Sequence, residues 1–334
     1  DGKIAAIALH PSPLSAADTI DGSGHTILPA LTNAHVHAWA PGQLQEAAKA
    51  GVLNILDMHG SSRSLGFFRS FKDSTNYARF YGAGPGVTVP NGHGTQFGMP
   101  APTVDSSTSA RQFVLNRVEE GSDYIKILRE PDRPTVTEQN IKDAVVTAHE
   151  NELLAVAHVS RSNDATLLAN ADVDGLVHVW FDEPIREKQL DTLAASDIFM
   201  VPTMLTVLRF SKLAAENNLD RKYIDSLTLI TEVNRLHKAG ITLLAGTDPP
   251  NFGINYGDDL ITELELLVAA GLTPTEAIQS ATVHTAKAFK LPYDSKLTPG
   301  NTADMILVKG DATQSVLALR EIVNVWKSGK LVKQ

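Results

Sequence analysis

Short apolar runs typical of strands alternate with longer amphipathic segments over most of the chain. Eight such runs occupy residues 25–37, 52–58, 78–84, 123–128, 153–158, 175–179, 198–203 and 241–248. The segments between them carry apolar residues at helical spacing, as at Ile141, Val145 and Ala148. Eight strands alternating with helices predict an α/β fold in which a closed (β/α)₈ TIM barrel is favoured over an open doubly wound sheet.

The two ends of the chain have a different pattern. Residues 1–9, 302–311 and 321–332 form short alternating runs bounded by Gly, Asp and Lys, which indicates strands of a separate sheet. We therefore predict a small β-sheet domain formed from both termini, residues 1–26 and 295–334, and a barrel domain over residues 27–294. The last helix before this sheet should begin after Thr273, because Pro274 and Glu276 fit the first-turn and capping-box positions.

Composition narrows the function further. The 334 residues are 43% hydrophobic and 20% charged, as in ordinary globular proteins. A net charge of −9 with no Lys/Arg cluster argues against a nucleic-acid partner, and no apolar run reaches the roughly 18 residues that a membrane span needs. With no cysteine, any bound metal must rely on histidine and carboxylate. We predict a cytoplasmic location, with export of a processed form as the alternative because the chain starts without methionine.

Two histidines end the first barrel run, in the stretch "NAHVHA". His35 and His37 are separated by one residue, so on a strand their side chains leave the same face of the sheet. Two neutral imidazoles aimed at one point supply half of a metal site. The structural alternative is a pair of histidines on a solvent-exposed strand end.

Further ligand-type residues fall at other predicted strand ends. They are Lys126, His158, His178 and Asp248. The carboxyl ends of barrel strands share one rim, so these four side chains should converge with the two histidines of the first strand. A hydrogen-bonded histidine or a turn-forming aspartate is the alternative at each position, but a lysine inside an apolar strand is costly unless it is paired. One metal site accounts for all six residues, and we favour it.

This set of residues, in this order, resembles the amidohydrolase superfamily of metal-dependent hydrolases. The resemblance rests on "LPALTNAHVHA", "GSDYIKIL", "AGTD", the long helical segment from Glu263 to Phe289, and "GNTADMILV". The stretch "AGPGVTVPNGHGTQFG" and the spacing from Lys126 to His178 are most similar to the imidazolonepropionase-like and prolidase-like branch. Asn33 stands where the family usually has aspartate.

The resemblance implies a binuclear metal centre and a hydrolase acting on carbon–nitrogen bonds. Two divalent ions, with Zn²⁺ as the first expectation, would be held by His35, His37 and Asp248 on one side and by His158 and His178 on the other. Lys126 would be N6-carboxylated and bridge them. A metal-bridging hydroxide would attack an amide or peptide-like bond of a small-molecule substrate, and Asp248 would pass the proton to the leaving amine.

Several alternatives remain open at this point. Lactone, ester or phosphotriester hydrolysis would use the same centre. A single-metal deaminase would need a glutamate three residues after His158, where this chain has Arg161. An inactive binding subunit is least favoured, because none of the six ligand-type residues is missing. His93 is a candidate substrate contact on its glycine-flanked loop, and an exposed sheet edge could pair two copies into a homo-oligomer.

Overall fold

The computed structural model describes residues 2–9, 16, 18–98, 101–217 and 224–333. Eight strands in this part of the chain form two parallel arcs, ordered β2-β3-β4 and β5-β6-β7-β8-β9. Their bounds are β2 (Leu31–Val36), β3 (Val52–Asp57), β4 (Arg79–Gly82), β5 (Ile125–Leu128), β6 (Ala155–His158), β7 (Gly175–Val177), β8 (Phe199–Val201) and β9 (Thr242–Leu243).

Backbone hydrogen bonds join the two arcs at both seams. The Val87 amide, just beyond β4, donates to the Lys126 carbonyl at 2.7 Å, and the Ala34 amide of β2 donates to the Ala245 carbonyl beyond β9 at 2.9 Å. The strands therefore close on themselves, and the predicted (β/α)₈ barrel is confirmed.

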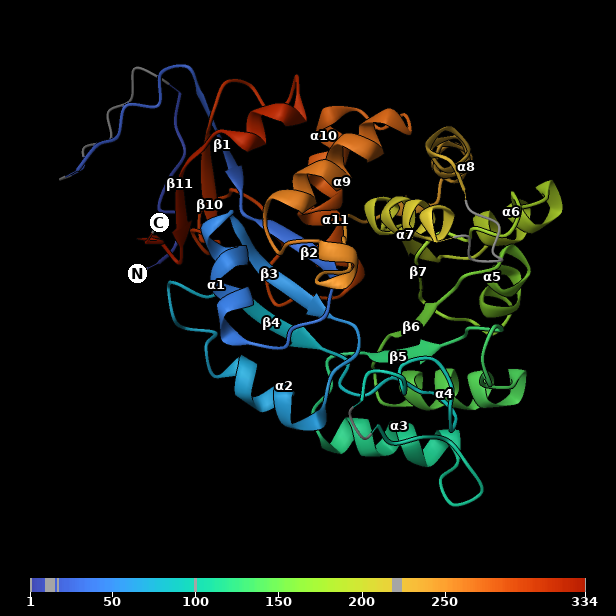
Figure 1. The fold of residues 1–334 in the computed structure, drawn as a ribbon. Coiled ribbons are helices and arrows are strands. Elements are labelled where there is room, and N and C mark those ends of the chain that lie inside the picture. Colours follow the sequence, from blue (N-terminus) through green and yellow to red (C-terminus); the bar gives the residue numbers. More distant parts are fainter. Residues whose placement is uncertain (1, 10–15, 17, 99–100, 218–223, 334) are drawn as a thin grey trace.

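The helices surround the strands on the outside of the barrel (Figure 1). They are α1 (Pro41–Lys49), α2 (Ser62–Arg69), α3 (Ala110–Glu119), α4 (Glu138–Glu150), α5 (Ser162–Ala169), α6 (Glu187–Ala195), α7 (Met204–Glu216), α8 (Ser226–Lys238), α9 (Asp258–Ala269), α10 (Pro274–Ser280) and α11 (Val283–Ala288), with short 3₁₀ turns at η1 (Asn251–Gly253) and η2 (Val316–Arg320). Within the described residues, no helix has the length and apolar character needed to cross a bilayer.

Local sequence explains where these helices begin and which side they bury. The α4 helix starts at a capping box in which Thr137 accepts from the Asn140 amide and Asn140 reciprocates. It then turns Ile141, Val145 and Ala148 toward the barrel, as their spacing predicts. The α10 helix begins after Thr273 with the predicted capping box, so that prediction is also confirmed.

Apolar side chains fill the inside of the barrel at the end where the strands begin. Tyr124, Leu154 and Phe199, at or just before the starts of β5, β6 and β8, belong to one buried cluster there. Phe289 closes it, with its ring 5.2 Å from that of Tyr124 and 5.0 Å from that of Phe199. This packing closes the barrel interior at that end, so the interior is open toward the carboxyl ends of the strands.

A four-stranded antiparallel sheet lies beside the barrel, near both chain ends (Figure 1). Its order is β1-β10-β11-β12, with β1 (His25–Pro29), β10 (Met305–Lys309), β11 (Ile322–Lys327) and β12 (Lys330–Leu331). The predicted C-terminal strands are confirmed. Lys327 fastens the sheet to the barrel, because its buried ammonium donates to the Ser74 and Tyr77 carbonyls at 2.7 and 2.6 Å.

The N-terminal strand prediction is wrong for the described residues 2–9. This segment forms only an isolated bridge between Lys3 and Thr302. Residues 5–9 are exposed, so their alternating pattern meets no surface on which to pack, and β1 takes the place beside β10 instead. The expected boundary between residues 26 and 27 falls inside β1. The division into 1–26 with 295–334, and 27–294, stays a prediction.

Candidate metal centre

One cavity of about 260 Å³ opens at the carboxyl ends of the barrel strands. Strands β2, β5, β6, β7 and β9, or the residues just after them, bring every predicted ligand to its wall. These are His35, His37, Lys126, His158, His178 and Asp248, and the predicted substrate contact His93 lines the same cavity. The structure therefore brings together all the side chains that the sequence analysis grouped.

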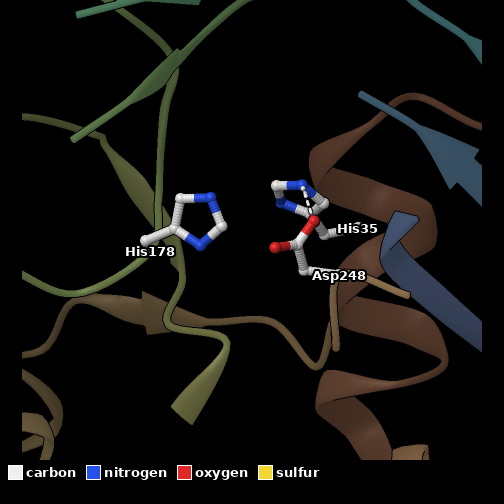
Figure 2. A group of neighbouring side chains, drawn as sticks. All are labelled: His35, His178 and Asp248. Carbon is white, nitrogen blue, oxygen red and sulfur yellow. Dashed lines mark ion pairs between the residues drawn. The ribbon is translucent and has the colours of Figure 1, made fainter. Parts of the chain in front are cut away.

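His35, His37 and Asp248 form the tightest cluster. The Asp248 Oδ1 atom lies 3.1 Å from His35 Nε2 and 3.0 Å from His37 Nε2, and the two Nε2 atoms are 3.4 Å apart. His178 joins from β7, since its ring is 4.8 Å from that of His35. Figure 2 shows the Asp248 carboxylate beside the His35 ring, with the His178 ring facing them. Three nitrogen donors and one carboxylate thus surround a small volume.

Burial and neighbouring charges together set the protonation of these donors; for His37, burial would lower the pKa, but Asp248 raises it above the usual value of a histidine. Burial lowers the pKa of His35 to about 3 and holds the pKa of His178 well below its usual value. Burial alone would raise the pKa of Asp248, but His35 and His37 hold it well below the usual range of a carboxyl group. At neutral pH two of the imidazoles are therefore neutral and the carboxylate is ionised, which is the state that a metal ion requires of its ligands.

Lys126 is the most unusual group in the cavity. Its side chain is 2% exposed, and its Nζ atom makes no hydrogen bond to any described residue. Burial lowers the pKa of Lys126 to about 7. A partnerless cation in this position is costly, so a large fraction of the amine is neutral and available to react or to bind.

A second group of donors lines the same cavity. One ligand atom each from His93, Glu130 and His158 all fall within 4.8 Å of one another. The His93 and His158 rings stack with centroids 4.4 Å apart, and Glu130 Oε2 is 3.5 Å from His158 Nε2. Burial would raise the pKa of Glu130, but His158, the Asp132 amide and Ser160 lower it to about 2.

Glu130 was not predicted from the sequence. It follows β5 by two residues and therefore points to the same rim as Lys126. Its position four residues after Lys126, just past a strand end, is the signal that could have identified it. The surrounding stretch, "REPDRP", is rich in charged residues, so one more carboxylate does not stand out in it.

Backbone geometry aims His178 into the cavity. His178 has φ = 69°, in the left-handed region, and its Nδ1 atom lies 2.7 Å from the Thr203 hydroxyl. Thr203 itself has φ = 46° and immediately precedes α7. A hydrogen bond at one ring nitrogen fixes the ring and leaves the other nitrogen for a ligand, which makes Thr203 a positioning residue that the sequence analysis missed.

Asn33 ties the first strand to the Asp248 loop. Its side-chain nitrogen donates to the Thr247 hydroxyl at 2.7 Å, while its oxygen accepts from the Thr247 and His35 amides at 3.1 and 3.2 Å. An amide can donate and accept at once, whereas an ionised aspartate only accepts. Asparagine, which stands here where the family usually has aspartate, can therefore make all three of these hydrogen bonds.

His59 fixes the loop that carries His93. Its Nδ1 atom accepts from the Gly86 amide at 2.9 Å, and its Nε2 atom lies 3.2 Å from the Gly94 carbonyl. Gly94 has φ = 91°, and a Cβ atom there would meet the Leu128 side chain at 2.7 Å. The glycine lets the loop approach the rim closely, which brings His93 against His158.

Comparison with known proteins places this barrel and site in a family. The family model described as "Amidohydrolase family" matches residues 26–333, and the chain belongs to that family. Over 111 residues it is 34% identical to an imidazolonepropionase from Streptomyces griseus, a match covering 30% of this chain and 27% of that protein. Over 85 residues it is 36% identical to an adenine deaminase from Lysinibacillus sphaericus, covering 24% of this chain and 14% of that protein.

A solved structure extends the likeness to the whole fold. A putative prolidase from Bifidobacterium longum superposes with a TM-score of 0.83 over 100% of this chain and 88% of its own, at 21% identity. The predicted resemblance to this superfamily is confirmed by the family model. At that identity the superposition establishes the fold, and the activity has to be argued from the cavity.

Proposed function

We propose that this chain is a metal-dependent hydrolase that cleaves an amide or peptide-like C–N bond of a small molecule. The observation that carries the proposal is that the four imidazoles, the carboxylate and the partnerless buried amine predicted as ligands all converge on a single cavity. If each of these residues had only a structural role and no metal were bound, the Lys126 amine would have no hydrogen-bond partner among the described residues. Nitrogen and oxygen donors of this kind fit divalent transition metals.

The proposed centre divides the donors between two ions. His35, His37 and Asp248 would hold one ion, and His158 and His178 the other. An N6-carboxylated Lys126 would supply the oxygen bridge, and Zn²⁺ is the first expectation for the metal. When bound, such ions lower the pKa of water toward neutrality and polarise a carbonyl group.

The chain's own residues would complete the reaction. Asp248 is ionised and lies at the bottom of the cavity, where its carboxylate can take the proton released during attack and return it to the departing amine. His93 is neutral, because burial lowers its pKa to about 2, and it would offer a hydrogen bond to the substrate carbonyl. Apolar side chains such as Leu128 and Val207 line the wall and exclude water from the reacting bond.

Metal analysis tests this proposal directly. Protein purified without chelator should carry close to two equivalents of metal per chain, and Lys126→Ala should lose most of it. The loaded protein should then hydrolyse members of a panel of amides, dipeptides and ureas, with lactones and phosphotriesters as the competing classes. One equivalent of metal that survives Lys126→Ala would remove the lysine from the centre, and a protein that binds no metal would overturn the proposal.

Deamination is the second candidate, because the Lysinibacillus relative is an adenine deaminase. Ammonia release from adenine and related aminopurines by the metal-loaded protein would favour deamination over hydrolysis of an amide C–N bond. Arg161 argues against a single-metal deaminase, because it stands where that mechanism needs a glutamate. Its side chain forms an ion pair with Asp132. A cytoplasmic location and assembly into a homo-oligomer are retained as predictions.

A further inference from the structure

Glu130 places a second carboxylate on the cavity wall, beyond the proposed metal ligands. The side chain is 7% exposed and is held in one position by two hydrogen bonds. Its Oε1 atom accepts from the Ser160 hydroxyl at 3.1 Å and from the Asp132 amide at 3.2 Å. Its Oε2 atom lies 3.5 Å from His158 Nε2, too far for a strong hydrogen bond. One oxygen of a carboxylate fixed in position is thus left with capacity to accept.

Cations that could neutralise Glu130, or bind a substrate carboxylate, are engaged elsewhere. Among the described lining residues, Lys126 is the sole lysine or arginine, and it belongs to the proposed metal centre. The arginines within two residues of a lining residue pair with other carboxylates: Arg129 with Asp164 at 3.0 Å, Arg161 with Asp132, and Arg209 with Asp259 at 2.9 Å. In the metal-free cavity, a carboxylate placed near Glu130 would therefore meet like charge, and Lys126 would be the one described lining lysine or arginine available to offset it.

The outer part of the cavity is aromatic. Phe97, Phe181, Phe210 and Phe252 all line it. The Phe210 ring lies 5.4 Å from that of Phe181 and 5.6 Å from that of Phe252, so three of the rings form a continuous wall. Phe97 and Phe252 are 47% and 41% exposed, which is unusual for side chains of this size. An apolar or aromatic group of a ligand would bury these rings.

We infer that the cavity selects aromatic or apolar amides that carry a hydrogen-bond donor or a positive charge near Glu130, and disfavours those with a free carboxylate there. Glu130 would act as the specificity-determining acceptor, while the phenylalanine wall holds the apolar part. This inference rests on the proposed function in that it takes the substrate to be an amide. The charge preference of the cavity can be measured without any turnover.

Benzamidine, benzamide and benzoate are matched probes, because they share one ring and differ in charge from +1 through 0 to −1. Their dissociation constants would be measured by calorimetry on metal-loaded and on chelated protein. The variants are Glu130→Gln, Glu130→Asp, and Glu119→Gln as a control at an exposed glutamate on α3. Metal content and amide hydrolysis are measured in parallel, so that a failure of the proposed function is seen separately.

In the chelated wild-type protein, benzamidine should bind about tenfold or more tightly than benzamide, as expected for one charge-assisted hydrogen bond. Glu130→Gln should abolish this preference, while Glu130→Asp and Glu119→Gln keep it. An equal preference in all four proteins would overturn the inference, as would a wild-type protein that binds benzoate best after chelation or binds none of the probes. If Glu130→Gln fails to fold, Glu130→Ala takes its place and should abolish the preference, and a folded Glu130→Ala that keeps it would overturn the inference.

Discussion

The buried amine of Lys126 predicts an unusual pH dependence of stability in the metal-free protein. Its pKa falls from 10.5 to about 7 on folding because burial disfavours the ammonium ion. The unfolded chain therefore binds more protons between these two pH values, so Lys126 destabilises the fold below pH 7 and the penalty fades as pH rises toward 10.5. Replacement by methionine keeps the length of the side chain and removes the charge.

The expected size follows from the shift. With about 1.4 kcal/mol for each pKa unit, the penalty is about 5 kcal/mol at pH 6 and about 2 kcal/mol at pH 9. The advantage of Lys126→Met over the wild type in free energy of unfolding should therefore shrink by about 3 kcal/mol between these conditions. Titrating groups far from the cavity act equally in both proteins and cancel in the difference, and the neighbouring His35, His93 and His178 stay neutral over this pH range because burial lowers their pKa values.

Urea unfolding followed by circular dichroism would measure this difference. The experiment needs chelator and no added bicarbonate, so that neither metal nor carboxylation alters the lysine. Lys142→Met, at an exposed position on α4, is the matched control and should leave the pH profile unchanged. A gap between Lys126→Met and wild type that stays constant from pH 6 to pH 9 would show that the amine is solvated or paired, and would refute the reasoning.

Three further predictions concern the centre and its support. Asp248→Asn with full metal content should lower kcat by about a hundredfold or more with little change in KM, because it removes a proton acceptor; steady-state kinetics that match the wild type would contradict that role. Thr203→Val removes the partner of His178 Nδ1 and should weaken metal affinity about 10–100-fold, measured by competition with a chromogenic chelator; Thr203→Ser is the control that should keep it. Phe289→Ala should cost about 3–5 kcal/mol of stability by opening a cavity in the floor of the barrel, while metal content at the other end stays unchanged; loss of metal without loss of stability would be inconsistent with this.

The barrel and the predicted ligand set could both be predicted from the sequence, because both depend on the apolar pattern of the buried strands. A parallel strand buried on both faces is a continuous apolar run, so a histidine or lysine within it or at its end stands out. Lys126 is the clearest case, because it interrupts such a run in β5. Barrel topology then brings these positions to one rim whatever the loops do.

Residues missed by the sequence analysis depend on loop conformation. In the sequence, Glu130 cannot be distinguished from any other charged loop residue. Only the conformation of the chain after β5 brings its side chain to the rim of the barrel. Thr203 contacts His178 only because both adopt left-handed backbone angles, which their side chains do not favour. The error at residues 2–9 has the same origin, since an alternating pattern specifies a strand only where a second surface exists to bury one of its faces.

The positions of the donors also link metal binding to closure of the barrel. His35 belongs to the first barrel strand and Asp248 follows the last, and their contact lies directly over the seam where the Asp248 amide donates to the His35 carbonyl at 2.8 Å. Gly246 permits this approach, because a Cβ atom there would stand 2.8 Å from the His35 amide nitrogen. The same seam that completes the fold therefore brings together the donors of the proposed first metal ion. Ion binding at this seam would stabilise the closed barrel over any form in which β2 and β9 separate.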